Sequence, residues 1–153
     1  MSTLKLGKVS PSGGMEMRDI VIGDLKTLND EKVETTAVLG APSVTTATAA
    51  ATAAKVVTIQ MKDAAGVNLA GRHFIRVWTA ETAFGAPSTD NITSIVMSNG
   101  TGSVEVTEHA HYTYVTGANG VATATVTMTA AGTNHVVVAV GGKVSSLQIV
   151  KTE

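Results

Sequence analysis

The last third of the chain alternates short runs of β-forming residues with turn clusters rich in glycine and asparagine. The runs occupy residues 121–128, 135–140 and 143–150, and the turn clusters occupy residues 116–120, 130–134 and 141–142. Valine, threonine and alanine dominate the runs, which is typical of antiparallel strands joined by tight turns. The pattern predicts two consecutive hairpins, and therefore an antiparallel sheet.

Residues 55–115 continue this pattern with further runs at 56–61, 72–78, 92–97, 103–107 and 112–115. In the run at 72–78, alternation places Ile75 and Val77 inward and leaves Arg76, Phe74 and Trp78 outward. The whole stretch has about seven short strands in about 100 residues, which is typical of an immunoglobulin-type sandwich. We therefore predict an all-β protein with an immunoglobulin-like β-sandwich over residues 55–153.

Residues 1–54 are predicted to form an extended N-terminal arm that ends in an Ala/Thr-rich linker at 44–54. The arm is too small and too polar to bury a core of its own, so we expect it to bind another surface. Its apolar residues are the candidates for that contact: Ile20, Val21, Ile22, Leu25, Leu28, Val38 and Leu39.

Composition excludes several classes of protein. The chain has no cysteine, so neither disulfides nor thiolate metal sites are available. Its net charge of −1 gives no general attraction to nucleic acid or to an anionic membrane. No apolar run approaches the roughly 20 residues of a membrane helix, and no signal peptide is recognisable. We expect a soluble chain made in a cytoplasm, with neither nucleic acid nor membrane as its partner.

The sequence offers few groups for chemistry. No phosphate-binding loop and no nucleophile elbow is present, so we expect neither enzymatic activity nor a cofactor. His109 and His111 are two residues apart, and in a strand both rings would face one way and offer a site for Zn²⁺ or Ni²⁺. The alternative is a pair of solvent-facing or interface histidines.

Two other groups of residues have a binding and a structural interpretation. Tyr112 and Tyr114 share one face of a predicted strand and form a possible ligand loop for a sugar. Oxygen-bearing loop residues are candidates for Ca²⁺ binding or, more simply, for shaping turns: Asp63, Asn68, Asp90 and Asn91.

Two motifs resemble bacterial immunoglobulin-like domains of the invasin/intimin kind. The first is VTIQMKDAAG at 57–66 followed by LAG at 69–71, and the second is TGANGVAT at 116–123 followed by AGT at 131–133. Gly117-Ala118 stands where the family often has Asp-Ala. The single copy and the long loop after Thr79 depart from adhesin repeats. In these respects the chain resembles domains of tailed-bacteriophage structural proteins.

The resemblance implies a non-enzymatic virion structural protein. We expect a capsid decoration or cement protein, anchored by its N-terminal arm, with the immunoglobulin-like domain projecting outward. The implied partners are the major capsid protein or another virion component and further copies of the chain, as a homotrimer. The alternative is a phage tail, fibre or surface adhesion module that binds a host glycan or protein.

Overall fold

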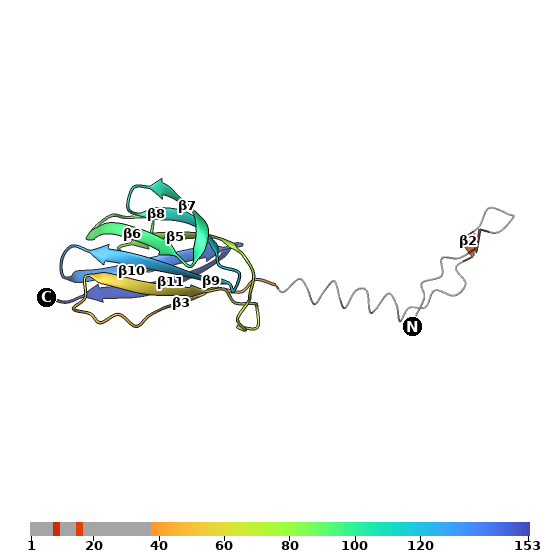
Figure 1. Ribbon diagram of the computed structural model, residues 1–153, viewed down its shortest axis with the longest axis horizontal. Coiled ribbons are helices and arrows are strands. Elements are labelled where there is room, and N and C mark those ends of the chain that lie inside the picture. The colour runs from red at the N-terminus through yellow and green to blue at the C-terminus, as the bar shows by residue number, and fades with distance from the viewer. Residues whose placement is uncertain (1–7, 10–14, 17–37) are drawn as a thin grey trace. The chain divides into compact units, whose positions relative to one another are not determined.

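Two antiparallel sheets face each other in the part of the chain that begins at Val38 (Figure 1). The computed structural model describes residues 8–9, 15–16 and 38–153. Within the first 37 residues, β1 (Lys8–Val9) pairs antiparallel with β2 (Met15–Glu16). The predicted contact residues between Ile20 and Leu28 lie outside the described residues.

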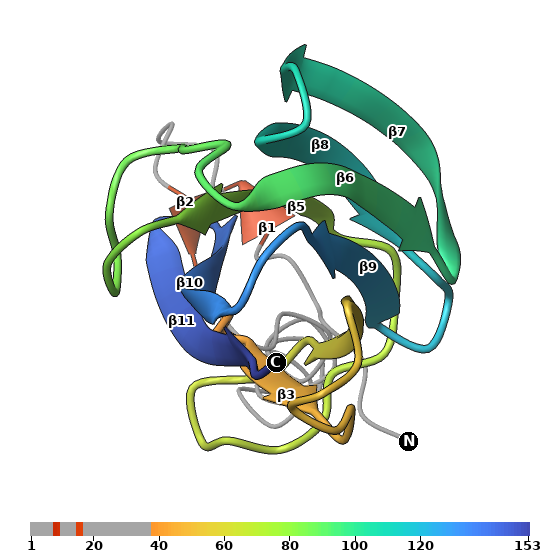
Figure 2. The ribbon, with the colours of Figure 1, turned by 90° about the vertical axis from the view of Figure 1, so that its left-hand side faces the viewer.

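One sheet has four strands and the other has five (Figure 2). The four-stranded sheet consists, in order, of β3 (Ser43–Thr46), β4 (Ala54–Gln60), β9 (Val121–Met128) and β6 (Ile92–Ser98). The five-stranded sheet consists of β11 (Lys143–Lys151), β10 (Gly132–Val140), β5 (Phe74–Ala80), β8 (His111–Thr116) and β7 (Gly100–Thr107).

This topology confirms the predicted immunoglobulin-like β-sandwich. The order β3-β4-β9-β6 corresponds to strands A-B-E-D of that fold, and β11-β10-β5 corresponds to G-F-C. The β7–β8 hairpin has no place in the seven-strand plan. It is inserted between strands D and E and extends the five-stranded sheet beyond β5.

The core lies between the sheets and is built by alternation along each strand. In β9, every second side chain is buried, and the threonines between them face outward. In β5, Ile75 and Val77 are completely buried, as the sequence predicts. The central core side chains are mostly β-branched: Val57, Ile59, Ile75, Val77, Ile95, Val126, Val136, Val138 and Ile149.

One predicted hairpin is confirmed and the other is wrong. β10 and β11 pair antiparallel around Gly141 and Gly142, whose φ angles of 51° and 79° suit a type I′ turn. β9 and β10, however, lie in different sheets, so residues 129–131 cross from one sheet to the other. Turn residues of this kind serve a hairpin or a crossing equally well.

The sandwich begins earlier than the sequence indicates. The compact unit runs from Val38 to Glu153, and β3 lies partly inside the predicted linker at 44–54. β3 pairs with β4 from Ser43 opposite Gln60 to Thr46 opposite Val57. Small uncharged residues are enough for an edge strand, because only one of its sides must pair.

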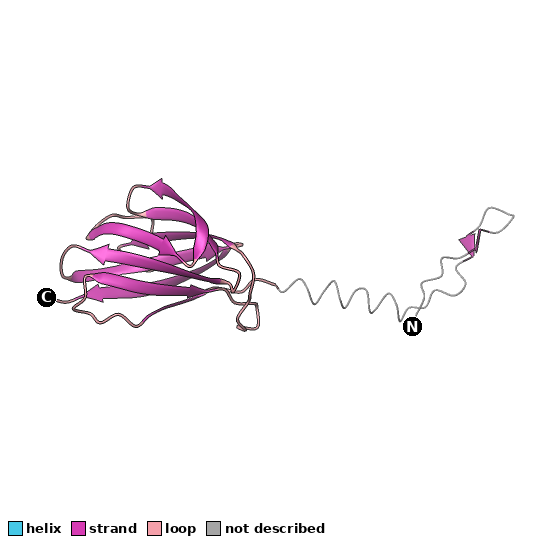
Figure 3. Cartoon of the chain, viewed as in Figure 1, coloured by secondary structure: helices cyan, strands magenta, loops and turns pink. Residues whose placement is uncertain are grey.

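The described residues form strands and loops throughout (Figure 3). Within them, no helix is long and apolar enough to cross a membrane.

Candidate functional site

The β7–β8 turn separates the two histidines that the sequence places together. His109 lies in the turn itself with a φ angle of 55°, and its ring nitrogens lie 3.6 Å from Glu105 Oε1 and 3.7 Å from Glu108 Oε1. His111 opens β8 and packs edge-on against Trp78, with ring centroids 5.8 Å apart. The condition for a shared face, that both histidines lie in one strand, is therefore not met. Within residues 8–9, 15–16 and 38–153, no three histidine or carboxylate side chains gather as a metal site.

The two tyrosines share a face, but that face is the core. Tyr114 is only 3% exposed, so it is not available to a ligand in the folded domain. Tyr112 is partly buried, and its hydroxyl donates a hydrogen bond to the Glu105 carboxylate, which also accepts the His109 backbone N–H at 2.7 Å. Alternation determines which residues share a face, but it leaves open which face is buried.

These contacts displace two pKa values. Burial and the hydrogen bond to Glu105 raise the pKa of Tyr112 to about 12. The hydrogen bonds from Tyr112 and from the His109 backbone lower the pKa of Glu105. Both displacements therefore follow from a local network of the inserted hairpin.

The outer face of the five-stranded sheet is half covered by the loop at residues 81–88. The Trp78 indole N–H donates to the Gly85 carbonyl at 2.8 Å, and the Thr79 hydroxyl donates to the Ser88 carbonyl at the same distance. Val137 of the neighbouring strand, which pairs with Trp78, is completely buried. A loop of the same chain therefore lies against the outward-facing Trp78.

The other half of this face is open. We call it the Phe74 patch. Phe74 is 62% exposed, Val104 is 57% exposed and Val144 is 41% exposed. Strand register aligns a row of side chains across the sheet beside Phe74: Val104, Thr113, Arg76, Ala139 and Val144. A cavity of about 290 Å³ lies there, lined by Phe74, Arg76 and residues 139–142. The patch combines apolar side chains with one exposed arginine.

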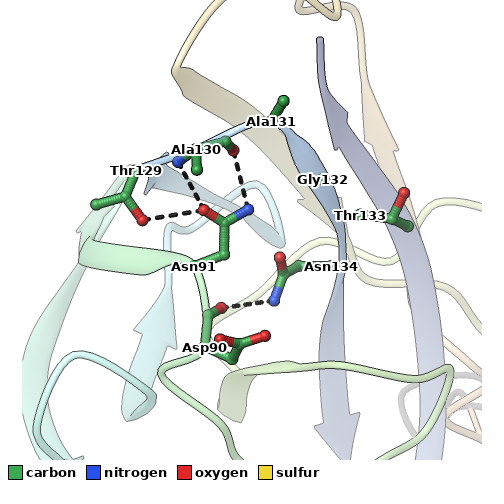
Figure 4. A pocket seen from close by; sticks show the side chains of 8 residues that line it. All are labelled: Asp90, Asn91, Thr129, Ala130, Ala131, Gly132, Thr133 and Asn134. Carbon is green, nitrogen blue, oxygen red and sulfur yellow. Dashed lines mark hydrogen bonds between the residues drawn. The ribbon is translucent and has the colours of Figure 1, made fainter. Parts of the chain in front are cut away.

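A polar pocket of about 420 Å³ lies where the chain crosses between the sheets (Figure 4). Asn91 Oδ1 accepts hydrogen bonds from Thr129 Oγ1 at 2.9 Å and from the Ala130 N–H at 2.7 Å, and Asn91 Nδ2 donates to the Ala130 carbonyl at 3.0 Å. The buried Asn134 side chain donates to the Asp90 carbonyl at 2.8 Å. The side-chain amides of Asn91 and Asn134 therefore hold the connection between β9 and β10 in its conformation.

Two of the other loop oxygens proposed for Ca²⁺ also make hydrogen bonds within their loops. Asp63 Oδ1 accepts the N–H groups of Ala65 and Val67 at 2.9 Å and 2.8 Å. Asn68 Oδ1 accepts a hydrogen bond from Lys62. The turn-shaping interpretation accounts for both of these residues and for Asn91.

Two of the predicted partner-binding residues lie in the described part of the chain. Val38 is 71% exposed. Leu39 is partly buried against the core and forms a backbone bridge with Asp63. Val38 is thus accessible to a partner, whereas Leu39 is engaged by the sandwich.

Three comparisons with known proteins give matches among solved structures alone. No family model matches the sequence, and no curated protein matches it. Among solved structures, it is similar to domains 4 and 5 of the S-layer protein SbsC, with a TM-score of 0.47 and 18% sequence identity over 76% of this chain. The chain spans about half of that solved chain, 53% of its length.

Proposed function

We propose that this protein is a non-enzymatic structural protein of a larger particle, and more specifically a capsid decoration or cement protein of a bacteriophage virion. In this proposal the N-terminal arm anchors the chain to the major capsid protein or another virion component, and the sandwich projects outward. The bacteriophage setting, the homotrimer and the location in the virion rest on the resemblance of the two sequence motifs.

The observation that carries the proposal is the division of the chain. The unit from Val38 to Glu153 is compact, and its core consists of residues between 39 and 149. The arm in this proposal is therefore residues 1–37, shorter than the sequence alone indicates. In this proposal its apolar residues from Ile20 to Leu28 make the contact with the partner.

Lys55 shows how a charged side chain is held inside the sandwich. Burial, and then the neighbouring Lys151, lower the pKa of Lys55. The Lys55 ammonium donates to the carbonyls of Ala49 and Ala50, each at 2.8 Å. This lysine therefore links β4 to the loop that precedes it.

Co-sedimentation with purified tailed-phage capsids that lack their decoration protein tests the proposal. The full chain is expected to pellet with the capsids, and the variant Ile20→Asp/Ile22→Asp is expected to stay in the supernatant. Val56→Asp is the matched control, because Val56 is an exposed residue of the sandwich. Equal binding of all three proteins, or failure of the full chain to bind any capsid, would contradict the anchoring role.

One observation favours adhesion as a second candidate function. Phe84 is 63% exposed in the loop at 81–88, next to a cavity of about 310 Å³ lined by residues 81–82 and 85–88. An exposed aromatic ring beside the polar groups of Glu81 and Ser88 is suited to a sugar. A glycan array with the full chain tests this role. Binding lost in Phe84→Ala and kept in Phe74→Ala would support it, and no binding by the unmodified chain would reject it.

A further inference from the structure

The five-stranded sheet has an outer face of which one half is covered by a loop and the other half is exposed. The loop at 81–88 is hydrogen-bonded to Trp78, and the neighbouring Val137 is buried, whereas Phe74 is exposed. Phe74 is a large aromatic residue that opens β5, and nearly two thirds of it is exposed. An exposed aromatic residue beside further exposed valines is typical of a contact surface.

The Phe74 patch is also basic. Arg76 lies at its centre and is exposed, and it forms no ion pair with any other described residue. Arg72 is exposed and lies two residues before Phe74, and Lys143 is exposed and directly precedes Val144. The matching surface must therefore present acidic groups and apolar side chains together.

The β7–β8 hairpin presents such a surface. All eight residues of β7 are exposed, and Val106, next to the turn, is 54% exposed. The Glu105 carboxylate is engaged by Tyr112 and by the His109 N–H. The Glu108 side chain, by contrast, is 86% exposed, and its contact is with His109 at 3.7 Å. Glu108 and Val106 thus form an acidic and apolar tip on the inserted hairpin.

We propose that the Phe74 patch receives the β7–β8 tip of a second copy of this chain, with Glu108 against Arg76 and Val106 against Phe74. Within one chain the β7–β8 tip lies beside Trp78 and Thr79, whereas Phe74 is at the opposite end of β5, so the tip of a chain does not reach its own Phe74. Contact of one patch with another patch would instead bring Arg76 against Arg76. The contact is therefore head-to-tail, and such contacts give a ring when the rotation between copies closes, as a trimer requires. This inference rests on the self-association in the proposed function and specifies its surface.

Charge reversal in the full chain tests the contact, with mass measured by sedimentation velocity and by chromatography with light scattering. The unmodified chain is expected to be a discrete oligomer at low salt. Arg76→Glu and Glu108→Arg are each expected to raise the dissociation constant at least about tenfold, because like charges then face each other. The double variant Arg76→Glu/Glu108→Arg is expected to restore the oligomer. Lys62→Glu is the control, a charge reversal in the β4–β5 connection.

Circular dichroism and thermal melting establish that each variant folds, and Phe74→Glu provides a second test of the patch. A monomeric unmodified chain overturns the inference, as do single variants with unchanged mass or a double variant that remains monomeric. Capsid binding distinguishes this failure from that of the proposed function. If Arg76→Glu and the unmodified chain are equally oligomeric and both still pellet with capsids, the contact is wrong and the anchoring role stands.

Discussion

Phe74 and Ile75 are neighbours in β5 that point to opposite faces, and their replacement by alanine separates folding from surface contact. Ile75 is completely buried between the sheets, so Ile75→Ala removes buried methyl groups and leaves a cavity. Substitutions of this kind cost about 2–5 kcal/mol of unfolding free energy. Phe74 is 62% exposed, so little more than a third of it contributes to burial. Full burial of such a side chain is worth about 1.5–3 kcal/mol, and Phe74→Ala should therefore cost about 1 kcal/mol or less.

Urea unfolding of both variants, followed by circular dichroism, measures the two free energies. The expected result is a large shift of the midpoint for Ile75→Ala and a small shift for Phe74→Ala, with similar slopes. A monomeric Phe74→Ala variant with nearly unchanged stability would agree with a contact surface on the outer face. A cost for Phe74→Ala equal to that for Ile75→Ala would refute the reasoning, because the patch would then be covered in the monomer.

Three further predictions follow from local features of the sandwich. Burial, and then Arg76, lower the pKa of His111 below 6.5, so the unfolded chain takes up a proton first on acidification and the unfolding free energy falls. This pH dependence should be weaker in His111→Gln, as measured by urea titrations that follow the fluorescence of Trp78, the single tryptophan. Because the pKa of Lys55 is lowered in the folded chain, the unfolded chain binds more protons as the pH approaches 10.5 from below. The unfolding free energy should therefore rise with pH in this range. The size-matched variant Lys55→Met should not show this rise in the same titration. Gly120 and Gly66 both have positive φ angles, but a Cβ at Gly120 would clash with the Leu69 carbonyl oxygen, whereas a Cβ at Gly66 would meet nothing within 4 Å. Gly66→Ala should lower the unfolding free energy by about 1–2 kcal/mol, and Gly120→Ala should lower it clearly more. Equal melting temperatures of the two variants would contradict the clash.

The candidate surfaces show what the alternation of residues along a strand can and cannot predict. Alternation correctly places Arg76 and Phe74 on the outer face of β5 and pairs Tyr112 with Tyr114 on one side of β8. It does not show that the tyrosine side is the core, because that depends on the strands packed opposite. The exposed Phe74 patch likewise has no sequence signal, since the loop at 81–88 covers one half of the sheet and leaves the other open.

His109 and His111 show the same limit at a turn. Their two-residue spacing predicts a shared face only if both lie in one strand. The chain instead turns at Glu108–Ala110, with His109 at a φ angle of 55°. The hydrogen bond from the His109 N–H to Glu105 holds that conformation and depends on the position of β7. Spacing alone therefore could not predict the separation of the two rings.

By itself, the amino-acid sequence determined the class of fold and the positions of most strands. β-branched runs and glycine turns act locally, through steric preference and alternation, so these features are readable from residue to residue. Only the tertiary structure decided which turns are hairpins and which cross between sheets. The connection at 129–131 crosses, whereas Gly141-Gly142 makes a hairpin. The physical reason is that side chains far away in the sequence bury the faces of a strand and so decide which sheet it joins. β10 has buried residues on both of its faces, so its position depends on such distant contacts.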